Sequence, residues 1–169
     1  MKTIAIPKKY LKETGDFYEY YSHKKKAPVL TIVISGNHEA SHYMRELYYG
    51  GWLAPNIYFL GASQMINVHL QGRSLRIYGC SGIFKQYSFY RAHPPLPFDQ
   101  NTKRGCYHVR QLELLRALLL EGNTKDRHCV DIGLSHDWPR GSERYGNYDY
   151  LISKKPFFED DVCLNFFVW

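Results

Sequence analysis

Closely spaced cysteines are missing from this 169-residue sequence. Its four cysteines form no Cys-x-x-Cys pair; they are Cys80, Cys106, Cys129 and Cys163. Because structural zinc sites and dithiol redox sites use such pairs, this spacing argues against a zinc ribbon or a redox centre. Widely separated cysteines fit an intracellular protein whose thiols stay reduced.

Long hydrophobic runs are also missing. The longest, LLRALLL at residues 114–120, is too short to span a bilayer and contains Arg116. The N-terminal sequence MKTIAIPKKYLK is interrupted at once by Pro7 and by lysines, so it lacks the apolar stretch of a secretion signal. We therefore expect no membrane segment and no export.

Positive charge and aromatic rings, by contrast, are abundant. The formal net charge of +6 and the pI near 9.1 favour a polyanionic partner, although charge alone does not separate RNA, DNA and acidic lipid. The 15 tyrosines, nine phenylalanines and three tryptophans offer rings that can stack on unpaired bases. Most of these rings are expected to belong to the core instead.

The apolar pattern predicts one α/β domain with layered sheets flanked by helices. Residues 29–34 (VLTIVI) and 129–134 (CVDIGL) are typical of central strands buried on both faces. Shorter strands are expected at 56–61, 65–70 and 75–79, and the turn at 71–73 joins the last two as a hairpin.

Helices are expected in four places and a long loop in one. The helical segments are 8–21 (broken at Gly15), the residues from Glu39 onward, 107–120 and 149–156. The proline-rich segment 87–105 has no helical or strand period and is expected to be a loop.

The stretch TIVISGNHEASHYMREL at residues 31–47 contains two overlapping metal motifs. His38, Glu39 and His42 form H-E-x-x-H, the zinc-protease pattern, which needs both histidines one turn apart on an established helix. Gly36-Asn37-His38-Glu39 is instead the pattern that a phosphoesterase places at the end of a strand. Because an apolar strand run precedes it and Gly36 breaks the chain, we expect His38 at a strand-to-helix turn and His42 on a helix surface.

Polar side chains come directly after the two apolar strand runs. Asn37 and His38 follow the first run, and His136 and Asp137 follow the second. Open α/β sheets bind ligands outside the carboxyl ends of their strands, and carboxamide oxygen and imidazole nitrogen suit divalent zinc, manganese or iron. A histidine beside such a site can protonate the leaving oxygen during phosphodiester hydrolysis.

The run SGNHEASHYMRELYYGGWLAPNIYFLG closely resembles the RNA lariat debranching enzymes, a branch of the calcineurin-like metallophosphoesterases. The likeness continues in RIYGCSGIFK, YHVR and LSHDWPRG, and begins earlier in FYEYYSHKKKAPVLT. Gly-Asn-His-Glu alone indicates only the wide superfamily, whereas GGWLAPNIYFLG and LSHDWP are far more particular. The resemblance implies a partial metallophosphoesterase domain at residues 1–158 and a divergent tail at 159–169.

The resemblance also implies an activity and its residues. The family hydrolyses the 2′,5′-phosphodiester at the branch point of excised intron lariats, which places the protein in mRNA processing in the nucleus. Asn37 and His136 match metal ligands, for Mn, Fe or Zn, and His38 matches the histidine that contacts the phosphate. Residues 87–107 occupy the place of the lariat recognition loop. The cations expected to hold RNA phosphates are Lys85, Arg91, Lys103, Arg104 and Arg110.

Several family motifs have no counterpart in this sequence. The Asp- or Cys-x-His and Gly-Asp motifs that should precede residue 25 are missing, and so is the closing Gly-His-x-His. Gly15-Asp16 lies in an aromatic, helix-like stretch and is not a substitute. The chain thus resembles the middle of a catalytic domain, and two ligands are too few to hold a metal pair firmly. We expect this chain to be inactive alone and marginally stable; the alternative is a metal-free module that binds branched RNA.

Overall fold

The structure of the chain is a computed structural model that describes residues 15–99, 102–121, 130–139 and 141–156. The expected tail at 159–169 lies outside these residues, as do Cys129, Cys163 and the first part of the helix expected at 8–21. Two three-stranded sheets and several helices make up the described part. The mixed α/β class predicted from the sequence is confirmed.

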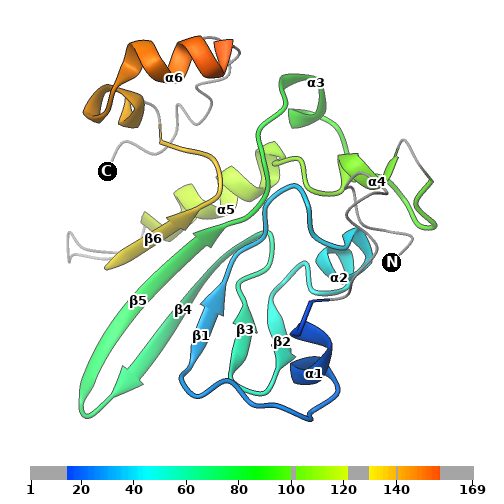
Figure 1. The fold of residues 1–169 in the computed structure, drawn as a ribbon, viewed down its shortest axis with the longest axis vertical. Coiled ribbons are helices and arrows are strands. Elements are labelled where there is room, and N and C mark those ends of the chain that lie inside the picture. The colour runs from blue at the N-terminus through cyan, green and yellow to red at the C-terminus, as the bar shows by residue number, and fades with distance from the viewer. Residues whose placement is uncertain (1–14, 100–101, 122–129, 140, 157–169) are drawn as a thin grey trace.

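One sheet has the strand order β1-β3-β2 and the other the order β4-β5-β6 (Figure 1). In the first, β1 runs parallel and β2 antiparallel to β3; the strands are Thr31–Val33, Gly51–Ala54 and Ile57–Phe59 in chain order. In the second, β4 runs antiparallel and β6 parallel to β5; the strands are Ser63–Leu70, Arg73–Cys80 and Ile132–Ser135. Parallel pairing makes β1 and β3 end at one edge, and β5 and β6 at another.

The hairpin between β4 and β5 is confirmed. Gln71 and Gly72 have φ values of 50° and 77°, the pair of positive angles that a type I′ turn requires. The turn sets Leu70 opposite Arg73, and pairing continues to Ser63 opposite Cys80. These two strands form the long ribbon that extends toward the lower left in Figure 1.

Strand β5 is covered on both faces near its carboxyl end. Successive strand residues point to opposite sides, so Tyr78 and Gly79 face different layers. Tyr78 belongs to a core cluster with Leu114 of helix α5 (Gln111–Glu121). On the other face, a Cβ atom on residue 79 would lie only 2.5 Å from Cδ1 of Leu60, just after β3. Glycine at this position lets the two sheets approach, and the layers follow the order helix, sheet, sheet.

Strands β1 and β6 correct the expectation of two central, doubly buried strands. Each is the edge strand of its sheet in the part of the chain that the structure describes. Val29 and Leu30, just before β1, are exposed, and so is Ile132 in β6. An apolar run specifies strand propensity, whereas burial depends on the neighbours that the topology supplies, so the run alone does not fix the position in a sheet.

The segment expected to be a loop contains two short helices, which corrects that prediction. They are α3 (Gln86–Phe89) and α4 (Thr102–Gly105). Just before α4, the Asp99 carboxylate accepts a hydrogen bond from the Thr102 backbone N–H at 2.6 Å. The Asp99 backbone N–H in turn donates to the Thr102 hydroxyl oxygen at 2.8 Å. This reciprocal pair closes the first turn in the manner of a helix cap, a local signal that the surrounding prolines obscure.

The other helices agree more closely with the sequence. Helices α1, α2 and α6 correspond to expected segments; their bounds are Phe17–Tyr21, Ser41–Glu46 and Tyr148–Lys154. Helix α5 begins later than predicted because residues 107–109 pair with Ile83 instead, through Ile83 N–H to Tyr107 and Val109 N–H to Ile83. Strand β2 was not expected, and a short 3₁₀ helix η2 (Ser142–Tyr145) precedes α6. Among the described residues, no helix is long and apolar enough to cross a membrane.

Candidate active site at the carboxyl ends of the strands

The residues that follow β1 and β6 lie against each other. A Cβ atom on residue 36 would lie 2.2 Å from both Cδ2 and Nε2 of His136, so the imidazole rests against the bare Cα of Gly36. Gly36 is buried, while the His136 side chain is 40% exposed. The ring therefore has one side on the Gly36-Asn37-His38 turn and another side open to solvent.

Hydrogen bonds join the ends of three strands beneath this turn. The Ser81 hydroxyl donates to the carbonyl of Gly61 at 2.6 Å and accepts from the Ser35 backbone N–H at 3.1 Å. The Gly82 N–H donates to the Ser35 carbonyl at 2.8 Å, and the Ser81 N–H to the Ala62 carbonyl at 2.9 Å. These hydrogen bonds thus join the segments at the carboxyl ends of β1, β3 and β5. Asn37 and His38 follow directly in the chain after Ser35, which takes part in two of them.

Glu39 holds the turn that carries Asn37 and His38. One carboxylate oxygen accepts hydrogen bonds from the backbone N–H groups of Gly36 at 2.8 Å and His38 at 3.2 Å. Helix α2 begins only at Ser41, so His38 does not share a helix with His42. The zinc-protease arrangement needs both histidines on one helix and a Glu39 carboxylate free to activate water, and this geometry provides neither. His42 instead contacts the ring of Phe98, as fits a surface helix residue.

Asp137 links His136 to the segment that follows β5. One carboxylate oxygen accepts a hydrogen bond from the Phe84 backbone N–H at 2.6 Å, and the other lies 3.5 Å from Nδ1 of His136. A carboxylate next to one ring nitrogen orients the imidazole and increases the basicity of the other nitrogen, as in many metal-ligating histidines. Asp137 therefore has the position of a residue that supports His136.

The donor set fits a divalent metal only in part. Asn37 and His136 supply a carboxamide oxygen and an imidazole nitrogen, both suitable ligands. No group of three His, Cys, Asp or Glu side chains lies together in residues 15–99, 102–121, 130–139 and 141–156. Firm metal sites in proteins use at least three protein ligands, so the described residues by themselves do not complete one.

Helix α2 also connects the turn to the segment expected to recognise RNA. The Ser41 hydroxyl donates to the Lys103 carbonyl at 2.8 Å, and the Cys106 thiol donates to the Ser41 carbonyl at 3.3 Å. Ser41 is fully buried at this junction. The end of α4 is therefore fastened to the first residue of α2, a few residues beyond the turn with Asn37 and His38.

The five cations expected to hold phosphates have different surroundings. Arg91 and Arg104 are exposed, and Lys85 and Lys103 are half-buried. Arg110 is only 5% exposed, and its guanidinium donates to the carbonyls of His108 at 2.9 Å and Gly105 at 2.8 Å. The Arg110 side chain therefore closes the segment from within, with two of its guanidinium nitrogens bonded to backbone carbonyls.

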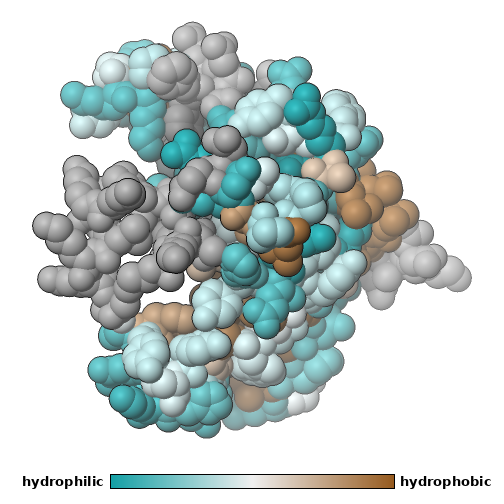
Figure 2. Space-filling view, turned by 90° about the vertical axis from the view of Figure 1, so that its right-hand side faces the viewer, coloured by the Kyte–Doolittle hydropathy of each residue, from teal (hydrophilic) through white to brown (hydrophobic). Residues whose placement is uncertain are grey.

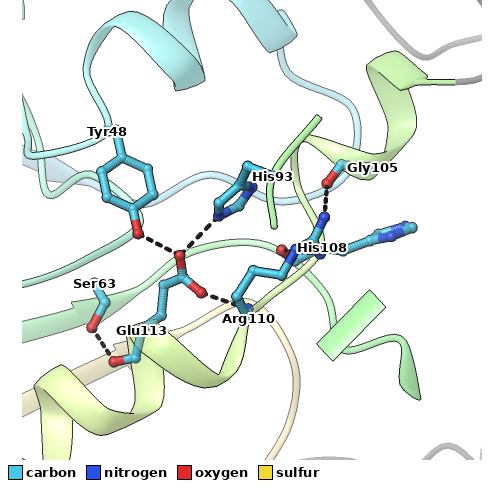
Figure 3. A network of polar contacts seen from close by, with 7 residues as sticks. All are labelled: Tyr48, Ser63, His93, Gly105, His108, Arg110 and Glu113. Atoms are coloured by element: carbon cyan, nitrogen blue, oxygen red, sulfur yellow. Dashed lines mark hydrogen bonds and ion pairs between the residues drawn. The ribbon is translucent and has the colours of Figure 1, made fainter. Parts of the chain in front are cut away.

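A buried carboxylate, Glu113, anchors the same segment to the core (Figure 3). One oxygen accepts from the Tyr48 hydroxyl at 2.5 Å and is 2.9 Å from Nε2 of His93, and the other accepts from the Arg110 N–H at 2.5 Å. Its backbone carbonyl accepts from the Ser63 hydroxyl at 2.8 Å. Glu113 thus joins α5 to the end of α2, to β4 and to the proline-rich segment.

The electrostatics of this network are those of a buried ion. Burial works to raise the pKa of the Glu113 carboxyl, but hydrogen bonds from His93 and Tyr48 outweigh it and leave the pKa below its ordinary value. Burial, followed by the hydrogen bond to Glu113, raises the pKa of Tyr48 far above its ordinary value. Burial and the nearby charges of Arg110 and Lys85 lower the pKa of His108 to about 4, so its ring is neutral at pH 7.

Sequence reasoning missed Glu113, Tyr48 and His93. Glu113 lies at the start of an apolar helix, where an acidic residue is typical of a solvated first turn. The only local signal was a charged residue on the face that also carries Leu114, and this does not identify its partners. Tyr48 and His93 come from segments far away in the chain, so their meeting with Glu113 depends on the tertiary fold.

The fold and the site define a mixed α/β protein with a polar site at the carboxyl ends of its strands. The chain is 52% identical over 163 residues to the lariat debranching enzyme of Drosophila melanogaster, covering 96% of this chain and 28% of that protein. It is 44% identical over 163 residues to the lariat debranching enzymes of Homo sapiens and Schizosaccharomyces pombe, covering 28% and 33% of their lengths. No protein-family model matches the chain.

These relatives agree with the resemblance that the sequence motifs carry. Over nearly its whole length the chain is similar to proteins that are all named lariat debranching enzyme. It spans about 28% of the length of the Drosophila and human relatives that it matches.

Proposed function

We propose that this chain forms part of the catalytic domain of an RNA lariat debranching enzyme with the calcineurin-like metallophosphoesterase fold. The reaction is hydrolysis of the 2′,5′-phosphodiester at the branch point of excised introns, in the nucleus. The observation that carries the proposal is the contact between His136 and Gly36, because it brings the segment after β1 and the segment after β6, with their candidate ligands, against each other. The names of the relatives support the choice of substrate.

Four residues have proposed roles in this reaction. Asn37 and His136 would hold a divalent Mn, Fe or Zn ion, whose chemistry is to activate water and offset the charge on the phosphate. His38 is exposed at the turn that Glu39 holds, and it would donate a proton to the leaving oxygen. Asp137 keeps the His136 ring oriented toward the turn.

The segment at 87–107 is the proposed recognition element for the RNA, within a domain at residues 1–158. Lys85, Arg91, Lys103 and Arg104 supply cations along or beside it, and arginine offers paired donors to phosphate oxygens. The Ser41 contact holds it at Lys103, and the Glu113 contact holds it at His93. A preorganised segment loses less conformational entropy when it binds.

A chimera tests this function. The 163-residue segment of this chain replaces the matching segment of the Drosophila melanogaster relative, and cleavage of a branched 2′,5′ RNA is measured with manganese and with chelator. We expect metal-dependent cleavage, and a loss of about 100-fold or more for Asn37→Ala and for His136→Ala. His69→Ala, an exposed change near the tip of the β4–β5 hairpin, is the matched control and should leave turnover unchanged. An inactive chimera beside an active parent would reject the proposal.

The chain alone is predicted to cleave no branched RNA above background, because its described residues supply only two candidate ligands. Incubation of the purified chain with branched RNA and Mn²⁺ measures this directly. Metal-dependent turnover by the unfused chain, abolished in His136→Ala, would show that the ligand set is larger than proposed.

The same shortage of ligands favours a second candidate, a metal-free module that binds branched RNA. The net charge of +6 suits this role. Binding of branched RNA that survives chelator and weakens steeply with salt would support the module. Tight uptake of one or two transition ions would exclude it.

A further inference from the structure

An open cleft lies beside α1 and β2, at the other end of the first sheet from the candidate active site. It has a volume of about 690 Å³, and its walls come from the end of α1 with the turn after it and from β2 with the turn that follows; they are Tyr21, His23, Lys26, Trp52, Leu53, Ala54, Pro55 and Asn56. The Asn56 carbonyl accepts from the Thr31 N–H at 2.8 Å, which fixes this wall to the amino end of β1. Residue 36 lies five residues further along the chain, roughly 16 Å away at the rise of a strand.

An exposed and well-supported tryptophan forms part of this cleft. Trp52 is 60% exposed, although it lies in a strand. It stands opposite Tyr58 in the β2–β3 pair, and the two rings are 5.1 Å apart and nearly perpendicular, at 82°. The pairing skips Leu53, so the register of the β2–β3 pair shifts between Trp52 and Ala54, as at a β-bulge. Such a ring offers a face to a ligand without losing much side-chain freedom.

The surroundings of this ring are basic. His23, Lys24, Lys25 and Lys26 are consecutive and all exposed. Lys25 pairs with Glu19, whereas Lys24 and Lys26 form no ion pair with any residue that the structure describes. No lining residue is acidic. Figure 2 views the side of the molecule on which α1 lies, and the lower part of that view is mainly hydrophilic and intermediate in hydropathy, with smaller hydrophobic areas between.

We propose that this cleft binds an unpaired stretch of RNA, with a base stacked on Trp52 and a phosphate near Lys26. Single-stranded nucleic acids are bound in this way, by a basic groove with aromatic rings on which successive bases stack. That the strand is RNA rests on the proposed function. The cleft then binds a part of the intron that lies away from the branch point. The site at the strand ends does not contact this part of the RNA.

Charge complementarity favours a nucleic acid strand over a peptide. A proline-rich peptide would also suit a groove with exposed Trp and Tyr rings. The uninterrupted His-Lys-Lys-Lys run would add little to the affinity for such a peptide, whereas it attracts the phosphates of a nucleic acid strand and raises the affinity for the strand. The peptide therefore serves as a competitor in the experiment.

The test uses the full chain, a fluorescent unbranched oligouridine of about eight nucleotides, and EDTA throughout. Anisotropy gives the affinity. We expect Trp52→Ala to weaken binding about tenfold and Trp52→Phe, which keeps a ring, to restore most of it. Lys26→Ala should reduce the slope of log affinity against log salt by about 0.7, the value for one lost phosphate contact. Tyr150→Ala removes a ring of matched exposure, 62%, from helix α6 and should leave the affinity unchanged.

Other outcomes overturn the proposal. If Trp52→Ala and Tyr150→Ala have equal effects while circular dichroism shows both folded, the cleft is not the binding site. An unchanged salt slope in Lys26→Ala, which carries no folding risk, has the same meaning. Displacement of the RNA by a proline-rich peptide whose own affinity falls in Trp52→Ala would assign the cleft to a protein partner.

The proposed function fails or holds independently of this test. Unbranched RNA and chelator exclude catalysis from the binding assay, so an inactive chimera rejects the debranching proposal and leaves the cleft untouched. Conversely, Trp52→Ala in an active chimera should keep turnover of a minimal branched RNA and weaken binding of one with a long single-stranded tail. Equal affinity of both chimeras for the long-tailed RNA would reject the cleft alone.

Discussion

Replacing Glu113 by glutamine tests whether the buried carboxylate anchors the 87–107 segment. Glu113 is 2% exposed and accepts hydrogen bonds from Tyr48, His93 and Arg110. Glutamine has the same shape but offers only one acceptor oxygen, and its NH₂ group must face either the Arg110 N–H or the Tyr48–His93 pair. The best arrangement keeps the Arg110 bond and requires Tyr48 or His93 to become an acceptor.

The structure sets the size of the effect. A hydrogen bond to an ionised group contributes about 1.5–3 kcal/mol, and one between neutral groups about 1 kcal/mol. Three bonds lose their ionic character in Glu113→Gln, so the free energy of unfolding should fall by about 2–3 kcal/mol. Glu113→Ala leaves three buried donors without an acceptor and should cost about 3–5 kcal/mol. In a chain of this size, 1 kcal/mol corresponds to about 2–4 °C in Tm.

The pH dependence gives an independent check. Because the folded pKa of Glu113 is depressed, its contribution to stability is present above the unfolded value of about 4.3 and is lost as pH falls through the folded pKa. The difference in the free energy of unfolding between the native chain and Glu113→Gln should therefore narrow as the pH falls below about 4.3.

Urea unfolding at pH 7 and at pH 3.5–4 measures these differences, and hydrogen exchange should show faster opening of the 87–107 segment in the variant. Glu46→Gln is the matched control, since Glu46 is exposed on α2 and should change stability by no more than about 0.5 kcal/mol. Equal stability of Glu113→Gln and Glu46→Gln, or a difference that widens in acid, would refute the role of Glu113 as an anchor.

Three further predictions concern the turn and the buried histidine. Gly36→Ala should move the His136 ring, because the new Cβ would lie 2.2 Å from it, and so reduce chimera turnover about 100-fold while Tm changes by at most about 3 °C; unchanged turnover contradicts the contact. Glu39→Gln should loosen the turn, which lowers the kcat of the chimera while its Tm stays nearly unchanged. A variant with native kcat would show that the turn needs no carboxylate. The folded pKa of His108 is about 4 and the unfolded value about 6.5, so acid protonates the unfolded chain first. The free energy of unfolding should therefore fall by about 3 kcal/mol as the pH drops from 6.5 to 4. His108→Gln should flatten that part of the urea midpoint curve, and an identical pH slope in both proteins argues against a neutral buried ring.

Local features of the chain were predictable from the sequence. The β4–β5 hairpin was expected from the turn at 71–73 between two short strand patterns. In the structure the turn is the pair Gln71-Gly72, which sets the register of the two strands residue by residue. The strand-to-helix turn at Gly36 was expected from an apolar run that ends at a glycine, and α2 begins two residues after Glu39. Both depend on interactions between residues close in the chain, which a pattern of residues records.

Other parts of the prediction failed where neighbours distant in the chain decide the outcome. Strands β1 and β6 lie in the runs expected to be central, yet both are edge strands in the part of the chain that the structure describes, because burial depends on which strands pair beside them. Arg110 was expected at the surface with the other cations, yet carbonyls of the segment that it closes capture its guanidinium. Hydropathy records the cost of burying a charge and not the partners that offset it.

The sequence by itself carried the resemblance to the lariat debranching enzymes, and it determined the hairpin, the Gly36-Asn37-His38-Glu39 turn and the identity of the candidate ligands. Only the tertiary structure decided that the His136 ring lies against Gly36 and that the Glu113 carboxylate contacts Tyr48 and His93. The same holds for the exposed position of Trp52 in a basic cleft. The physical reason is the range of the interactions. Turns and caps are closed within a few residues, whereas these three features bring together segments that are distant in the chain.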